Sequence, residues 1–315
     1  MKYILFDSEN GGILLSPNAK IVHSPKSKHK IIGWSKGCIT TIFLSKRNDT
    51  IICWYDFQAV ICYWICMMLF KKRKIVCMNI LLKDKPTRKN KIVAMLYKKM
   101  LKSADVIASV TSKEYGEHIK ERLNIRKELF LLHDVYHDYY KYENEVQEKP
   151  NSVFCGGRNG RDWDFIIDVA RATPGVEFHL VMPSNIHERY VDLPLNIIAK
   201  SNLTIEEFMK EMCSCSIVAL PLDTEAPAGL IVFFQAAANY KYIITTDTMT
   251  TREYFSDGRG CLLPNNVQIW SKTIREKLNS AEDNRKASGK LLEFLRRECS
   301  EEKFSQGIEK MINSL

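Results

Sequence analysis

The chain lacks the features of a membrane-spanning or repetitive protein. Its apolar run from Ala59 to Phe70 has 12 residues, whereas a spanning helix needs roughly 20. There is no low-complexity segment and no internal repeat beyond the twofold use of a strand-turn-helix unit. We expect the apolar run to be a buried core helix between two strands. The alternative is partial insertion beside a bilayer, with the basic residues 71–74 among the headgroups.

The sequence also lacks paired cysteine motifs. Ten cysteines are present without a pair of Cys-x-x-Cys knuckles, so we expect neither a metal site nor a disulfide framework. Buried free thiols that pack as small apolar groups suit a reducing compartment. Met1 to Phe6 is typical of a first strand, and Asp7 and Glu9 follow at once. We therefore expect no signal peptide and a cytoplasmic location.

Acidic residues are scarce in the first third of the chain. Residues 1–104 hold 20 Lys and Arg against 5 Asp and Glu, whereas residues 147–315 hold 20 against 23, so the net charge of +9 comes from the first part. Basic clusters at 26–30, 71–74 and 83–91 would attract an anionic membrane surface, at about 1 kcal/mol per residue. Aromatic residues do not interleave with these clusters, and no nucleic-acid reader motif is evident, so we expect no nucleic acid partner.

Two stretches in the second half have the pattern of a strand, a glycine-bearing turn and a helix. In the first, Gly156 and Gly157 follow a β-branched and aromatic pair, and Arg158 and Arg161 flank the turn. Glycines let the backbone approach a ligand, and the N–H groups of a helix start attract anions. A guanidinium offers a donor fork that suits a diphosphate. The alternative is a plain turn with solvated charges.

The second stretch repeats this pattern. The continuous apolar run Ile217 to Leu222 is typical of a strand covered on both faces. Pro227 is tolerated near a helix start. The backbone N–H groups of Ala228, Gly229 and Leu230 would then be uncommitted, and they would face the same side as the first turn if the two strands run parallel.

These residues resemble the GT-B glycosyltransferases, specifically the family 4-like group that uses nucleotide-sugar donors in bacterial polysaccharide assembly. The resemblance covers most of the chain and is strongest over residues 153–253. Arg158 occupies the position of the family's Gly-Arg turn, and Arg161 or a neighbour stands where lysine is frequent. Gln235 stands at the family's second glutamate, which commonly holds the donor ribose. An amide can hydrogen-bond the same hydroxyls.

The chain departs from this family at the first glutamate. Pro227 stands there and offers no side-chain acceptor for the donor sugar. Glu225 or Asp223 in the same loop could substitute. The donor sugar and the stereochemical course of the reaction are therefore left open.

The resemblance implies an α/β protein of the GT-B fold, with two Rossmann-like doubly wound domains that face each other across a cleft and a C-terminal helix that crosses back to the first. We expect an acceptor-binding domain at 1–146, a donor-binding domain at 147–290 and a C-terminal helical segment at 291–315. The strands expected in the first domain are Tyr3–Phe6, Cys38–Leu44, Thr50–Trp54, Ile75–Met78 and Asp105–Val110.

By this resemblance the protein moves a sugar from a nucleotide-diphosphate sugar to a hydroxyl of a lipid-linked glycan, without a metal or a resident cofactor. An inverting enzyme needs a base at the carboxyl end of a strand in the first domain. Asp56 and Asp84 are the candidates. Each is otherwise a helix cap or a solvated loop carboxylate, and a retaining enzyme needs no such base. The alternative function is a catalytically inactive relative that binds nucleotides or acts as a scaffold.

Overall fold

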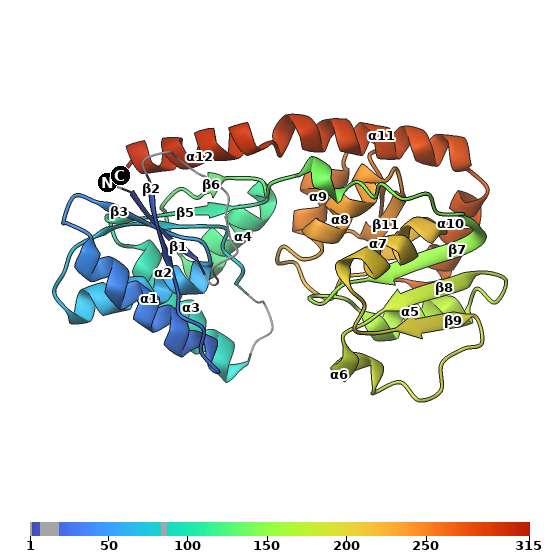
Figure 1. The fold of residues 1–315 in the computed structure, drawn as a ribbon, viewed down its shortest axis with the longest axis horizontal. Helices are drawn as coiled ribbons and strands as arrows, with labels where there is room; N and C mark the ends of the chain where they lie inside the picture. The colour runs from blue at the N-terminus through green and yellow to red at the C-terminus, as the bar shows by residue number, and fades with distance from the viewer. Residues whose placement is uncertain (1, 7–18, 83–86) are drawn as a thin grey trace. The chain divides into compact units, whose positions relative to one another are not determined.

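The computed structural model describes residues 2–6, 19–82 and 87–315. These residues belong to two compact units (Figure 1). The N-terminal unit runs to Asp134 and also includes Glu301–Leu315, and the C-terminal unit comprises Val135–Ser300. The sequence placed the boundaries after residues 146 and 290.

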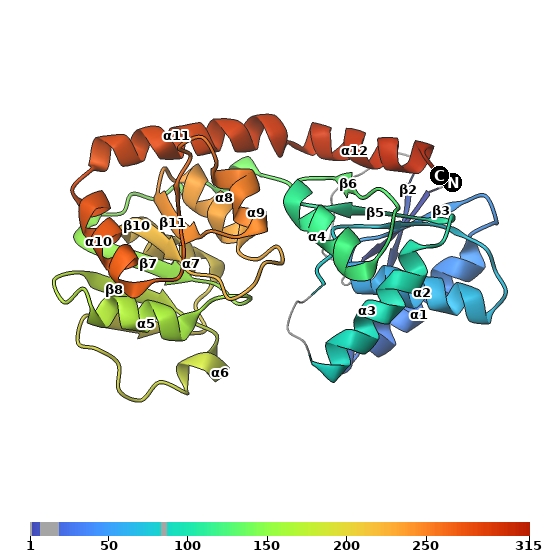
Figure 2. The same ribbon diagram turned by 180° about the vertical axis from the view of Figure 1, so that it is seen from behind.

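The N-terminal unit is a parallel sheet with the strand order β2-β1-β3-β4-β5-β6. Helices α1 to α4 cover one of its faces and α12 covers the other (Figures 1 and 2). The strands are β1 Lys2–Phe6, β2 Ala19–His23, β3 Thr50–Cys53, β4 Lys74–Cys77, β5 Val106–Val110 and β6 Phe130–Leu131. The helices are α1 Lys30–Leu44, α2 Asp56–Met68, α3 Arg88–Leu101, α4 Lys113–Leu123 and α12 Glu301–Asn313.

The prediction of a strand over Cys38–Leu44 is wrong, because these residues form the second half of helix α1. The run is rich in β-branched residues, which favour strands. However, the buried positions of α1 recur with helical spacing and include two glycines. A Cβ on Gly33 would lie 2.5 Å from the Pro25 carbonyl oxygen, and one on Gly37 would lie 2.6 Å from the Ser24 hydroxyl. Close packing of the helix on the preceding segment therefore outweighs local strand propensity.

The apolar run before the basic cluster forms a core helix, as predicted. Helix α2 lies between β3 and β4 in the chain, and it buries Ala59, Cys62 and Cys66. The C-terminal end of the helix is exposed to solvent, unlike its middle. Met68 is 67 % exposed, and Phe70, just beyond the helix, is 96 % exposed. None of the helices in the described part of the chain is long and apolar enough to cross a bilayer.

The cysteines are free thiols, as predicted, but several of them lie together. Cys62 in α2 hydrogen-bonds with Cys38 of α1, Cys53 of β3 and Cys66 one turn along its own helix. The hydrogen bond with Cys62, together with burial, raises the pKa of the Cys53 thiol well above its usual value. The Cys53 thiol therefore stays protonated, and the buried cysteines of this cluster act as small packing groups.

The C-terminal helix packs in the N-terminal unit, as the resemblance implied. The ring of Phe304 in α12 meets Trp54 edge-on at 5.9 Å. Gly307 lies against Leu132, where a Cβ would approach the leucine side chain to 2.5 Å. The chain thus enters the C-terminal unit at Val135 and returns from it at Glu301.

The C-terminal unit is a second parallel sheet, with the order β12-β11-β10-β7-β8-β9. Helices α5 and α10 pack together on one face, and α7, α8 and α11 on the other. The strands are β7 Lys149–Gly156, β8 Glu177–Val181, β9 Ile197–Lys200, β10 Cys215–Leu220, β11 Tyr242–Thr246 and β12 Cys261–Leu263. The helices are α5 Trp163–Arg171, α6 Ser184–His187, α7 Ile205–Ser214, α8 Leu230–Ala238, α9 Met249–Phe255, α10 Val267–Leu278 and α11 Ala281–Glu298, with a 3-10 turn at Asp138–Tyr140.

Candidate functional site

The two glycine-bearing turns meet at the carboxyl ends of neighbouring strands. Strands β7 and β10 pair in parallel, with Val153 opposite Ile217. The turns that follow them are joined by backbone hydrogen bonds, since the Asp223 N–H donates to the Gly160 carbonyl at 3.1 Å and the Asp162 N–H to the Pro221 carbonyl at 3.1 Å. The carboxyl edge of a parallel sheet is where open α/β folds bind ligands.

Two glycines enclose the side chain of Arg161. Gly157 has a φ of +128° and Gly229 a φ of +84°. Residues other than glycine rarely adopt such backbone angles. A Cβ on Gly157 would lie 2.7 Å from Arg161 Nη2, and a Cβ on Gly229 would lie 2.9 Å from Arg161 Nη1. Both turns therefore need glycine so that their backbones can close around one guanidinium.

Arg161 is a buried cation without a carboxylate partner among the described residues. The side chain is only 7 % exposed. Its Nε donates to the Gly156 carbonyl at 2.9 Å and its Nη1 to the Asn159 carbonyl at 3.2 Å. Burial lowers the pKa of Arg161 to about 10, so the group is still charged at neutral pH. An uncompensated buried charge is costly, and an anionic ligand would relieve that cost.

Helix α8 begins beside this guanidinium. Gly229 is its N-cap and supplies no side-chain cap. The first N–H groups of a helix have no acceptor within it and carry a partial positive charge. The Arg161 side chain and the start of α8 therefore form one electropositive region, built from both turns that the sequence singled out.

The remaining residues of the first turn differ in their roles. Arg158 is exposed and makes no hydrogen bond or ion pair with a described residue. Gly156 is required by packing, because a Cβ there would lie 2.5 Å from the ring of Phe154 and 2.8 Å from Phe208. Its carbonyl positions Arg161. The direct contact of Gly156 with a ligand stays a prediction.

Gln235 and Glu225 lie in different surroundings. Gln235 is 9 % exposed, in the second turn of α8. Among the described residues its side-chain amide has no hydrogen-bond partner. Glu225 instead holds the start of helix α9, since its Oε2 accepts the Met249 N–H at 2.8 Å and its carbonyl accepts the Thr250 hydroxyl at 2.9 Å. This structural role takes up one carboxylate oxygen that the sequence assigned to the donor sugar.

Sequence reasoning missed two residues that support the site. The Thr246 hydroxyl at the end of β11 accepts the Leu222 N–H at 2.8 Å and donates to Asn265 Oδ1 at 2.6 Å. Asn265 Nδ2 in turn donates to the Leu222 carbonyl at 3.0 Å. A threonine at a strand end is a weak signal for such a role, and Asn265 gives none, because its contact is long-range.

Of the two candidate bases for an inverting reaction, only Asp56 lies in the described part of the chain. Asp84 lies outside the described residues. Asp56 is 8 % exposed at the start of α2. Its Oδ1 accepts the Phe57 N–H at 2.7 Å, and its Oδ2 accepts the Leu81 N–H at 2.8 Å and the Tyr97 hydroxyl at 2.6 Å. Burial raises the pKa of Asp56 despite these hydrogen bonds. The contacts join α2 to the segments that follow β4, which favours the structural role over that of a base.

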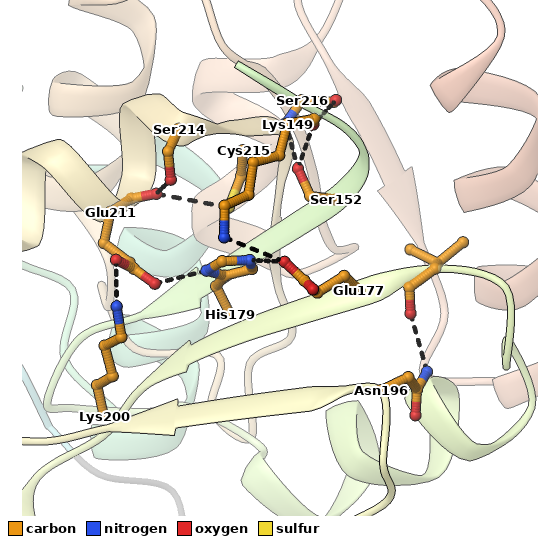
Figure 3. Close-up of polar contacts among 11 residues, drawn as sticks. Lys149, Ser152, Glu177, His179, Asn196, Lys200, Glu211, Ser214, Cys215 and Ser216 are labelled. Atoms are coloured by element: carbon orange, nitrogen blue, oxygen red, sulfur yellow. Dashed lines mark hydrogen bonds and ion pairs between the residues drawn. The ribbon is translucent and has the colours of Figure 1, made fainter. Parts of the chain in front are cut away.

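A buried histidine fastens helix α7 to the sheet of the same unit (Figure 3). His179 on β8 is 2 % exposed. Its Nε2 lies 2.6 Å from Glu177 Oε1 and its Nδ1 lies 2.5 Å from Glu211 Oε1. Glu211 Oε2 also binds Lys200 Nζ at 2.6 Å. Each imidazole nitrogen of His179 thus faces a carboxylate, one on its own strand and one on helix α7.

The network also changes the acidity of its carboxylates. The hydrogen bond from His179 lowers the pKa of Glu177. Burial acts to raise the pKa of Glu211, but hydrogen bonds from Lys200 and His179 bring it below its usual value. Helix α7 also carries Phe208, which packs against Gly156. By fixing α7 on the sheet, the network therefore helps to position the start of the first glycine-bearing turn.

Comparison with known proteins shows the fold. A scan of protein-family models and a search of curated sequences found no match. Solved structures do match over the whole chain. HepE of Anabaena in complex with UDP-glucose has a TM-score of 0.74 at 12 % identity, with 100 % of both chains covered. Sucrose-phosphate synthase from Thermosynechococcus elongatus has a TM-score of 0.76 at 13 % identity and covers 98 % of this chain and 88 % of its own.

A third structure agrees with these two. The UDP-forming α,α-trehalose-phosphate synthase from Burkholderia vietnamiensis has a TM-score of 0.68 at 10 % identity, with 100 % of both chains covered. These structures are GT-B glycosyltransferases. The chain therefore has the GT-B fold, as the resemblance implied.

Proposed function

We propose that this chain, which has the GT-B fold, is a glycosyltransferase that uses a nucleoside-diphosphate sugar as donor. The observation that carries the proposal is the buried guanidinium of Arg161, which lies between the two glycine turns and has no carboxylate partner in the described part of the chain. The two turns offer a fixed cation and the N–H groups of a helix start at one point, which suits a diphosphate.

In this proposal the C-terminal unit stabilises the leaving group. As the bond from the sugar to the diphosphate breaks, negative charge grows on the terminal phosphate. Arg161 and the N–H groups at the start of α8 are already oriented there, so they stabilise the transition state without reorganisation. Arg158, exposed on the same turn, adds a second cation when the donor is bound. We infer that these groups suffice without a metal ion.

We further propose uridine as the base and Gln235 as a ligand of the ribose. HepE is described with UDP-glucose, and the trehalose-phosphate synthase is described as UDP-forming. The unpaired amide of Gln235 lies along the helix whose start would bind the diphosphate. An amide can both donate to and accept from the ribose hydroxyls.

The acceptor in this proposal is a hydroxyl of a lipid-linked glycan in bacterial surface polysaccharide synthesis, at the cytoplasmic face of a membrane. The support is the excess of basic residues in the N-terminal unit, which favours an anionic surface as partner. The alternative is an inactive relative that binds the nucleotide. It is favoured by Pro227 at the first family glutamate and by the structural contacts of Glu225 and Asp56.

One experiment separates these functions. UDP, GDP, ADP and their sugar conjugates are titrated by calorimetry, and release of the nucleoside diphosphate is then followed with the sugar nucleotide that binds best. We expect UDP binding and slow UDP release by hydrolysis, accelerated by glycan acceptors. Tight UDP binding without release from any conjugate would favour the inactive relative. Absence of binding to all three diphosphates would refute both.

A further inference from the structure

In the N-terminal unit, the exposed charged side chains of residues 19–82 and 87–104 are all positive. Within the described part of this range, which omits 83–86, the acidic residues are Asp49 and Asp56. Both are buried, each with 8 % exposure. The Asp49 carboxylate accepts a hydrogen bond from the backbone N–H of Lys46 at 2.7 Å. The Asp56 carboxylate accepts hydrogen bonds from the Tyr97 hydroxyl and from backbone N–H groups. No described carboxylate of this stretch therefore offsets the basic side chains at its surface.

Large apolar side chains are exposed on the same surface, where helices α1 and α2 end. Phe43 is 61 % exposed, Met68 is 67 % exposed and Phe70 is 96 % exposed. The Lys71 ammonium lies 3.7 Å from the centre of the Phe43 ring, so the two helix ends are adjacent. We call Phe43, Met68, Phe70 and the neighbouring basic residues Arg47 and 71–73 the α1–α2 tip.

The backbone of the α1–α2 tip holds Phe70 outward. Phe70 has a φ of +53°, a left-handed conformation that is uncommon for a bulky residue. Just beyond it, Arg73 caps the end of α1, because its Nε donates to the Ser45 hydroxyl at 2.8 Å and its Nη2 to the Ser45 carbonyl at 2.7 Å. The loop that presents Phe70 is thus anchored on both helices.

A hollow of about 480 Å³ lies beside Phe70 in the tip. It is lined by Phe70 and by four cations, Arg47, Lys71, Lys72 and Arg73. None of these four cations forms an ion pair with a described carboxylate. A phosphate group would find several donors there, and an apolar chain attached to it would find Phe70.

We propose that the α1–α2 tip docks the protein on an anionic phospholipid bilayer. Phe43, Met68 and Phe70 enter the boundary between headgroups and acyl chains, and the hollow takes the phosphate of one lipid headgroup. A bilayer presents an apolar layer beneath an anionic one, which matches exposed aromatic and thioether groups ringed by cations. A second copy of the chain is a poorer partner, because it would bring two positive surfaces together.

The inference does not rest on glycosyl transfer, because the tip and the candidate donor pocket belong to different units. Loss of membrane binding would leave UDP binding intact. Conversely, a protein without UDP affinity would still float with vesicles.

The test is flotation of the full chain with vesicles of phosphatidylcholine alone or mixed with phosphatidylglycerol. We expect binding to the mixed vesicles alone, weakening as salt rises. Phe70→Ser should weaken it about tenfold, and Lys72→Glu, which changes two charges, about 30-fold. Matched controls in the C-terminal unit are Val191→Ser, at a residue 89 % exposed, and Lys210→Glu, at an exposed lysine. Both should float like the unchanged protein, and all four variants should bind UDP equally.

Three outcomes would overturn the proposal. The first is equal flotation with both kinds of vesicle, or flotation that Phe70→Ser and Lys72→Glu leave unchanged. The second is loss of flotation on adding soluble glycerol phosphate, which would make the hollow a site for a free anion. The third is a dimer in sedimentation experiments that Phe70→Ser dissociates and that does not float with the mixed vesicles.

Discussion

Replacement of Arg161 by methionine should weaken UDP binding far more than it destabilises the fold. The guanidinium uses Nε and Nη1 for the carbonyls of Gly156 and Asn159, while Nη2 lies against Gly157 without a described partner. One charge-assisted hydrogen bond to the diphosphate is worth about 1.5 to 3 kcal/mol. We therefore expect UDP affinity to fall roughly 10- to 150-fold.

The effect on folding should be smaller because two terms oppose each other. The substitution removes the two hydrogen bonds from Arg161 to backbone carbonyls, each worth about 1 kcal/mol. It also removes a buried cation that no described carboxylate balances, and replacing such a charge by an apolar group is often neutral or stabilising. We expect the free energy of unfolding to change by less than about 1 kcal/mol.

Calorimetry with UDP and with uridine, combined with thermal unfolding, tests this reasoning. Uridine lacks the diphosphate, so its affinity should not change in Arg161→Met. Arg171→Met is the matched control on α5, where the arginine is exposed and paired with Asp168. Arg161→Lys keeps the charge and should lose less affinity than methionine. Unchanged UDP affinity in a folded Arg161→Met protein, or an equal loss for uridine, would refute the assigned role.

Three further predictions concern other parts of the chain. Gly229→Ala places a methyl group against Arg161 at positive φ, so we expect UDP affinity to fall at least tenfold, as calorimetry can measure. His179→Asn should cost about 3 kcal/mol in chemical unfolding. The stability from its two carboxylates, whose pKa values are lowered, is present above their usual pKa and is lost as pH falls through the lowered values. The free energy of unfolding of His179→Asn should therefore fall less steeply than that of the unchanged protein as the pH is lowered. The same dependence on pH in both proteins would contradict this account. Asp56→Asn should reduce thermal stability modestly while UDP release keeps its rate and pH profile. A hundredfold slower release in a folded Asp56→Asn protein would instead identify it as the base.

Local patterns predicted the elements whose burial is nearly uniform. Continuous apolar runs such as Ile217–Leu222 allow few alternatives to a buried strand, and β10 covers Cys215–Leu220. The strand prediction for residues 38–44 was wrong because the helix that they form depends on the packing of Gly33 and Gly37 against the preceding segment. That contact is tertiary, and strand propensity is too weak to resist it.

Residue types in the turns predicted that two glycine-bearing loops would matter, but not how they work. Arg161 was expected as a flanking charge, and it lies buried between Gly157 and Gly229. Glu225 was expected near the donor sugar, and it caps α9. Each outcome depends on which distant segment a side chain meets, and one sequence carries no such information.

The amino-acid sequence alone therefore determined the parallel α/β class, the uneven charge and the two turns, because each follows from composition, spacing and backbone freedom within a short segment. The tertiary structure alone decided that β7 and β10 are neighbours, that one guanidinium serves both turns, and that the side chains of Asp49 and Asp56 are largely shielded from solvent. The physical reason is that burial and charge compensation are properties of the packed chain, since they depend on groups separated by tens of residues.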